Sequence, residues 1–220
     1  MRLLHPTYFP SILTYALMQS ADKILFEVND FYEKQTYRNR LYIQSANAKQ
    51  MLSVQVKHTH SDGKQLYKDV LISHDFDWQK LHWRSLETAY RTSPYFEFYE
   101  DDLRPVFEKK YTYLVDLNID SIQTVNQLLD LSKDFELTKT YQPDYGDKVE
   151  DLRFLKNAKK EPSIMEKMPF YTQMFQDRHP FMPNLSILDL LFMEGPNTVN
   201  YLEKIARLWA DQSAVHGSSI

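Results

Sequence analysis

The sequence predicts an α/β protein with a mixed, partly parallel sheet that starts with a βαβ unit, flanking helices, and a helical C-terminal portion. The first observation is a pair of short apolar runs near the start, separated by a helical stretch. That spacing is typical of parallel strands joined by a right-handed crossover. The second observation is a change from strand-like to helical apolar periodicity near position 77. With 220 residues, we expect a single domain over 1–220.

The N-terminal part contains the expected strands. Residues 2–5 and 23–28 predict the two parallel strands, and Ser11 can cap the helix between them. Later runs alternate between apolar and polar residues more regularly, which predicts strands with one exposed face. These strands are expected at residues 40–44, 51–56 and 68–72, the first two joined as a hairpin.

The middle of the chain predicts helices and then a long irregular segment. A helical apolar stripe begins at Trp78, and further helices are expected over 98–109 and 111–131. Residues 138–168 contain few aliphatic side chains and several prolines, which predicts a long surface excursion or a lid.

The C-terminal part predicts two helices. Asn184 or Ser186 can cap the first of them, and Gly195 is expected to end it. Pro196 suits the first turn of the second helix.

Composition and charge exclude several classes of site. The net charge is −4 and no basic block stands out, so we expect no nucleic-acid partner. The absence of cysteine excludes thiol chemistry, and with four glycines and no known metal-ligand pattern we expect neither a cofactor nor a metal. His58 and His60 share one side of a predicted strand without a carboxylate to complete a metal site. No segment predicts a membrane span or a signal peptide, so we expect a cytoplasmic protein.

The polar residues that follow the first two strands predict a functional edge. His5 ends the first strand and Asp30 follows the second, and parallel neighbours bring their carboxyl ends to the same edge of the sheet. We also expect the helix after Ser11 to direct its unpaired N–H groups toward this edge. A histidine and a carboxylate are the groups that acid–base catalysis needs. In the alternative interpretation, Tyr8 and Phe9 only cover the edge of the sheet with their side chains, and the edge has no functional role.

Three further positions have both a functional and a structural interpretation. In "YRNR" (37–40), Arg38 and Arg40 could bind a carboxylate or phosphate, or could pair with surface glutamates. His82 lies on an apolar helical stripe, where a histidine held within the core is more common than a catalytic one. Asn118 could brace the loop after the first strand, since a buried amide needs partners.

Several segments, in order, resemble the WbqC-like protein family. They cover most of the chain: "HPTYFP" (5–10), "ADKILFEVND" (21–30), "YRNR" (37–40), "LSVQVK" (52–57), "WQKLHWRSLETAYRTSPYF" (78–96), "LVDLNIDSI" (114–122) and "FMPNLSILDLLFMEGP" (181–196). The resemblance implies a role in the biosynthesis of surface polysaccharides such as O-antigen in Gram-negative bacteria. The matching polar positions are His5, Tyr8, Asp30, Asn39, Arg40, His82, Tyr90, Asn118, Asn184, Ser186 and Asp189. Family members often carry glutamine where this chain has His5.

Two functions are compatible with these features. The first is a transferase that acts on a sugar or nucleotide-linked sugar, with Asp30 as general base and His5 or His82 as its partner. Arg38 and Arg40 would hold donor phosphate or carboxylate, and Asp30→Asn is expected to abolish turnover without affecting the fold. The other substrate-binding candidates are Tyr8, Asn39, Asn118 and Asn184.

The second function is a non-catalytic scaffold of a biosynthetic assembly. Its tyrosine-rich surface and apolar terminal helices would then serve a partner protein or a homodimer.

Overall fold

The computed structural model of the protein describes residues 1–57, 65–159 and 162–216. Its strands form a four-stranded sheet and a separate two-stranded sheet. The strands are β1 (Arg2–Leu4), β2 (Ile24–Phe26), β3 (Arg40–Gln44), β4 (Lys49–Ser53), β5 (Phe135–Leu137) and β6 (Glu150–Asp151). The α-helices are α1 (Ile12–Gln19), α2 (Trp78–Tyr90), α3 (Phe96–Glu108), α4 (Leu114–Leu128), α5 (Ile187–Glu194) and α6 (Thr198–His216).

The four-stranded sheet has the order β5-β2-β1-β6, and its neighbouring strands are parallel. Strands β1 and β2 pair in register, with Leu3 opposite Leu25, and α1 connects them. The predicted βαβ unit is therefore confirmed. Strands β5 and β6 were not predicted, since each has only two or three residues and pairs with a strand far away in the sequence.

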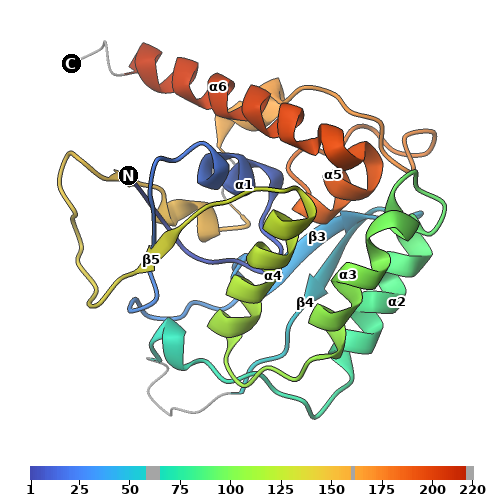
Figure 1. The fold of residues 1–220 in the computed structure, drawn as a ribbon, viewed down its shortest axis with the longest axis horizontal. Coiled ribbons are helices and arrows are strands. Elements are labelled where there is room, and N and C mark those ends of the chain that lie inside the picture. The colour runs from blue at the N-terminus through green and yellow to red at the C-terminus, as the bar shows by residue number, and fades with distance from the viewer. Residues whose placement is uncertain (58–64, 160–161, 217–220) are drawn as a thin grey trace.

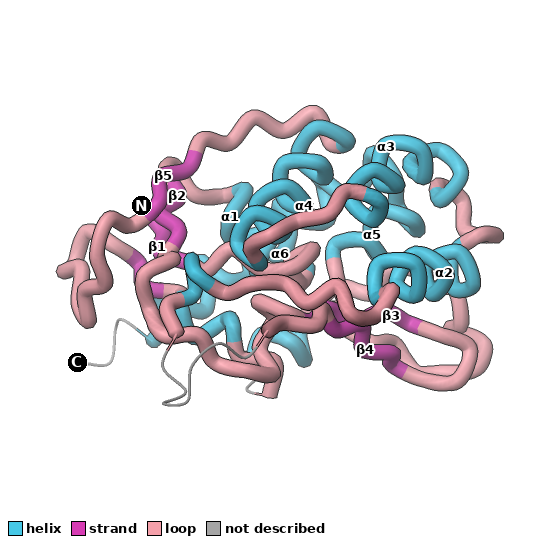
Figure 2. The backbone as a smooth tube through the Cα atoms, turned by 90° about the horizontal axis from the view of Figure 1, so that it is seen from below, coloured by secondary structure: helices cyan, strands magenta, loops and turns pink. Residues whose placement is uncertain are grey.

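The predicted hairpin is also confirmed, because β3 and β4 pair antiparallel with Leu41 opposite Leu52. It forms its own small sheet near α2 and α5 rather than extending the parallel sheet (Figure 1). Figure 2 shows the parallel sheet at one end of the molecule and the helices beside it.

The prediction of a strand at residues 68–72 is wrong. Residues 67–69 form the short 3-10 helix η1 (Tyr67–Asp69), and Leu71 and Ile72 make only isolated bridges. The physical reason is that the backbone here bonds to the loop after β2 instead of to a ladder partner. The Tyr67 N–H donates to Asp30 O, and the Tyr67 hydroxyl donates to Pro6 O.

The helices form a buried core with the inner faces of both sheets. The predicted helices after position 77 are confirmed, with ends shifted by up to three residues. Ser186 caps α5 through a bond from Leu188 N–H, as expected, and α6 packs along α1 (Figure 1). Among the described residues, no helix combines the length and the apolar character that crossing a bilayer requires.

Segment 138–168 contributes to both the sheet and the core. Its middle part supplies β6, the outer neighbour of β1, and then the 3-10 helix η2 (Arg153–Lys156). A second 3-10 helix, η3 (Ser163–Lys167), follows near its end. Leu152 and Ile164 are buried, so parts of this segment are packed against the rest of the protein.

Candidate functional site

His5 and Asp30 meet at the carboxyl edge of the parallel sheet. His5 directly follows β1, Asp30 lies four residues after β2, and the His5 Nε2 atom is 2.8 Å from Asp30 Oδ2. Both residues line a cavity of about 730 Å³. This volume lies within the range of about 300–1,000 Å³ that is typical of small-molecule sites. The predicted edge thus brings an imidazole and a carboxylate to one cavity.

The Asp30 carboxylate has two further cationic partners. Arg38 Nη1 donates to Oδ1 at 3.0 Å and to Oδ2 at 3.2 Å, and Lys156 Nζ donates to Oδ2 at 3.0 Å. Arg38 is fully buried, with its guanidinium carbon 5.1 Å from the ring centre of Tyr32 and 4.9 Å from that of Tyr67. Arg38 therefore supports Asp30 from behind, out of reach of a ligand in the cavity.

The pKa directions of His5 and Asp30 define their charge states. Burial is the main cause that lowers the pKa of His5 to about 4, and it outweighs the hydrogen bond to Asp30. For Asp30, burial acts to raise the pKa, but the hydrogen bond from His5 and the charges of Arg38 and Lys156 hold it well below its usual range. At neutral pH we therefore assign an ionised Asp30 and a neutral His5.

The hydrogen-bond network also assigns the tautomer of His5. An ionised carboxylate only accepts, so Nε2 carries the imidazole proton and Nδ1 keeps a lone pair. Nδ1 is buried and has no hydrogen-bond partner within the described part of the protein. This unpartnered acceptor is the one nitrogen of His5 that could take a proton.

The rest of the cavity wall comes mainly from the loop after β2 and from segment 138–168. It comprises Asn29, Phe31, Glu33, Tyr141, Asp151, Arg153, Phe154 and Lys156. The last five of these were not among the predicted site residues, because their segment has the composition of a surface excursion. A signal was present, since Leu152 and Leu155 recur at a spacing of three and are both buried in the structure.

The other predicted site residues lie away from the cavity. Tyr8 and His82 form a buried pair, 3.1 Å apart between the hydroxyl and Nδ1, and burial lowers the pKa of His82 to about 4. Asn118 donates to Pro6 O and Arg38 O, which is the bracing role considered above. The described part of the cavity wall includes none of the remaining predicted site residues, which are Tyr8, Arg38, Asn39, Arg40, His82, Asn118 and Asn184.

Asn39 and Arg40 lie at the β3–β4 hairpin and not at the cavity. The Asn39 amide donates to Val54 O, next to the β3–β4 hairpin. Arg40 is the first residue of β3 and pairs in register with Ser53. His58 and His60 lie outside the described residues.

The expectation that α1 directs free N–H groups at the site is wrong. The Ile12 N–H donates to Leu185 O, the Leu13 N–H donates to Asn184 Oδ1 at 2.8 Å, and the Thr14 N–H donates to Ser11 Oγ. Ser11 and the segment before α5 together satisfy these donors, so Asn184 caps a helix and does not contact the cavity.

Comparison with known proteins identifies relatives of this chain. A curated protein from Mycobacterium tuberculosis, described as "Uncharacterized protein Rv1507c", is 26% identical over 224 residues, which cover 91% of this chain and 96% of the relative. No solved structure matches the chain. The sequence model of the WbqC-like protein family matches residues 5–162 and 141–201. These matches span most of the sequence, and the chain therefore belongs to the WbqC-like protein family.

Proposed function

We propose that the protein is a transferase that acts on a sugar or a nucleotide-linked sugar during surface polysaccharide biosynthesis, as in O-antigen formation. The observation that carries the catalytic part is the Asp30–His5 pair at the wall of a cavity large enough for a substrate. The resemblance to the WbqC-like family supplies the polysaccharide context. Acid–base groups, a cavity and a sheet edge together are a common setting for catalysis.

In this proposal, His5 takes the proton and Asp30 orients His5. Asp30 is a poor base, because its pKa is held well below its usual range by His5, Arg38 and Lys156 despite its burial. The roles therefore differ from those the sequence suggested. The Nδ1 atom of His5 is buried in this structure, so the proposal includes a local opening of the cavity wall that brings an attacking hydroxyl or amine to it. Nδ1 then accepts the proton of this nucleophile while the nucleophile bonds to the transferred group and the leaving group of the donor departs. The Asp30 carboxylate stabilises the imidazolium that forms.

Genetic complementation tests this proposal and separates it from the scaffold function. The gene is deleted in its own host, and the surface polysaccharide and the pool of nucleotide-linked sugars are analysed by mass spectrometry. We expect a mass change in the polysaccharide and accumulation of an unmodified precursor. Wild-type protein should reverse both changes.

Two variants then test the role of His5. His5→Gln keeps an N–H donor for Asp30 but removes the ring lone pair, so we expect no rescue. His179→Gln is the matched control, since His179 is a half-buried histidine outside the cavity wall whose ring nitrogen bonds to Ala46 O. Full rescue by His5→Gln would refute proton transfer by His5, and rescue by every folded cavity variant would favour a scaffold.

A further inference from the structure

We infer that the cavity beside His5 binds the ring of a carbohydrate and leaves the phosphate groups of any nucleotide-linked substrate outside. This inference rests on the proposed function and specifies which part of the substrate the cavity recognises. The charged, aromatic and hydrogen-bonding groups of the wall support it.

Arg153 has the geometry to bind phosphate, but other protein groups already occupy all its N–H donors. Its Nε and Nη2 atoms donate to Asp151 at 2.5–3.0 Å. Nη1 donates to Gln142 O at 2.8 Å and lies 3.5 Å from Glu27 Oε2, and Nη2 also donates to Pro143 O at 2.9 Å. A guanidinium has five N–H donors, so these contacts leave none for a phosphate.

Lys156 and the total charge of the wall also disfavour phosphate. The Lys156 ammonium donates to Asp30 at 3.0 Å and to Glu33 at 3.2 Å, which leaves one of its three N–H groups. With His5 neutral, three cations (Arg38, Arg153 and Lys156) are paired with four carboxylates (Glu27, Asp30, Glu33 and Asp151) in and directly behind the wall. A pyrophosphate would therefore meet an excess of negative charge and one available N–H donor, whereas phosphate sites need several free donors.

Two aromatic rings on the wall, Tyr141 and Phe154, are each 51% exposed. Phe154 stacks on Trp209 with an interplanar angle of 23°, and the Arg153 guanidinium lies 5.3 Å from the centre of the Tyr141 ring. Each ring is thus held from one side. A half-exposed ring held in this way presents an apolar, electron-rich surface that suits the C–H face of a pyranose.

The hydrogen-bonding groups of the wall favour a ligand that carries donors. The wall offers hydrogen-bond acceptors in the carboxylate oxygens of Glu33 and Asp151. The Glu33 and Asp151 side chains are 63% and 40% exposed, so a ligand can reach them. Sugar hydroxyl groups donate to such acceptors, whereas phosphate oxygens cannot. Acceptors beside aromatic faces therefore favour a polyhydroxylated ring.

Saturation-transfer difference NMR on the full chain tests the inference, with methyl glycosides of neutral hexopyranoses as probes. We expect saturation of the ring C–H protons and little change in affinity with added salt, because no ionic contact is involved. UDP and inorganic phosphate are added as competitors, and neither should displace the glycoside. Phe154→Ala and Tyr141→Ala should each weaken binding by about tenfold.

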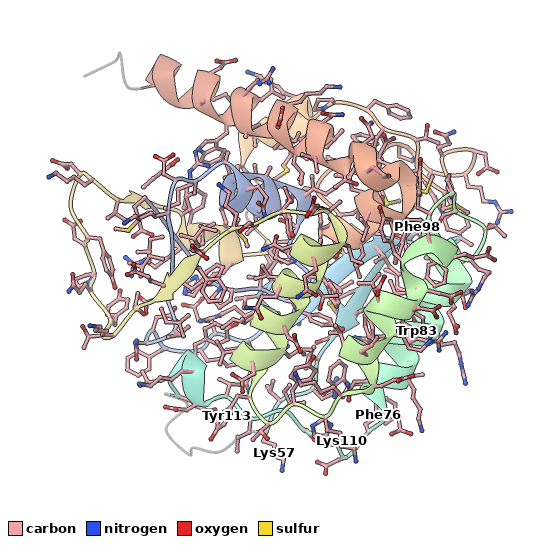
Figure 3. All side chains as sticks on the ribbon, in the orientation of Figure 1. Lys57, Phe76, Trp83, Phe98, Lys110 and Tyr113 are labelled. Atoms are coloured by element: carbon pink, nitrogen blue, oxygen red, sulfur yellow. The ribbon has the colours of Figure 1, made fainter. Side chains whose placement is uncertain are left out.

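The control is Phe98→Ala, which removes an even more exposed ring elsewhere. Phe98 is 71% exposed on α3, at the opposite end of the molecule from β5 (Figure 3). The affinity of the Phe98→Ala variant for the glycoside should equal that of the wild type. Circular dichroism confirms that each variant is folded.

The inference is overturned if no glycoside binds, if Phe154→Ala binds as tightly as the control, or if UDP displaces the glycoside with a steep salt dependence. These outcomes are distinct from failure of the proposed function. Rescue by His5→Gln would refute proton transfer while glycoside binding stays intact. Displacement by UDP would refute the ring assignment while His5 remains essential.

Discussion

The effect of Asp30→Asn on stability follows directly from the ion-pair geometry. The substitution removes the negative charge that Arg38 contacts at 3.0 Å and Lys156 at 3.0 Å. The Asp30 side chain is only 9% exposed and that of Arg38 is 0% exposed, so water cannot replace the lost carboxylate. The sequence alone suggested that this variant would keep its fold unaffected. The structure predicts a clear loss of stability instead.

The size of the loss can be bounded. Breaking a buried ion pair by removing one partner costs about 3–5 kcal/mol. Here Lys156 retains Glu33 at 3.2 Å, and Arg38 retains Phe31 O at 3.4 Å and the rings of Tyr32 and Tyr67. We therefore expect the low end, about 3 kcal/mol, which corresponds to a fall in Tm of about 6–12 °C for a chain of this length.

Urea unfolding at pH 7, followed by circular dichroism, measures this loss. The control is Asp177→Asn, since Asp177 is 72% exposed and lies 3.7 Å from Arg178, and we expect a change of less than about 1 kcal/mol. Because the pKa of Asp30 is lowered on folding, its stabilisation is complete above its unfolded pKa of about 4 and is lost only in stronger acid. A variant within about 1 kcal/mol of wild type, at unchanged m-value, would contradict the ion-pair reasoning.

Three further predictions concern acid sensitivity, helix capping and a tight turn. The folded pKa values of His5 and His82 are about 4, below the unfolded value of about 6.5, so the unfolded chain binds more protons between these two pH values. The free energy of unfolding should therefore fall by about 3 kcal/mol per histidine from pH 6.5 to pH 4. Urea titrations over this range measure this pH dependence, and an unchanged pH dependence in His82→Gln would contradict the assignment. Asn184→Ala removes the side-chain cap of α1 and should cost about 1 kcal/mol in urea unfolding, whereas a neutral result would show that water replaces the cap. Gly195→Ala should lower the free energy of unfolding by about 2 kcal/mol or more, because Gly195 has φ +54° and a Cβ there would lie 2.5 Å from the ring of Tyr95. A variant with the wild-type Tm would contradict this prediction.

The sequence predicted those parts of the fold that local patterns encode. The parallel β1–β2 pair was accessible because both strands are short apolar runs on either side of a capped helix. Strand β6 was not accessible, since "ED" has no apolar letter and its role depends on pairing with β1 from a distant part of the chain. The segment at 68–72 has strand-like composition, but tertiary bonds to the loop after β2 decide its conformation.

The same distinction applies to the candidate site. His5 and Asp30 could be predicted to meet, because each follows one of two parallel strands. Lys156 could not, since it contacts Asp30 from 126 positions later in the sequence. His82 and Asn118 are polar residues on apolar faces, and a sequence cannot tell whether such residues face a cavity or a buried partner.

The pairing of β1 with β6 affects how the protein is made. A ribosome adds about 5–20 residues per second, so the partner of β1 at Glu150 emerges roughly 7–30 s after β1 itself. Throughout that interval one side of β1 is a bare strand edge, which is a template for unwanted association. Nascent chains of this protein should therefore depend on chaperone protection until the last third of translation, and shortening this delay by circular permutation should raise the yield of native protein.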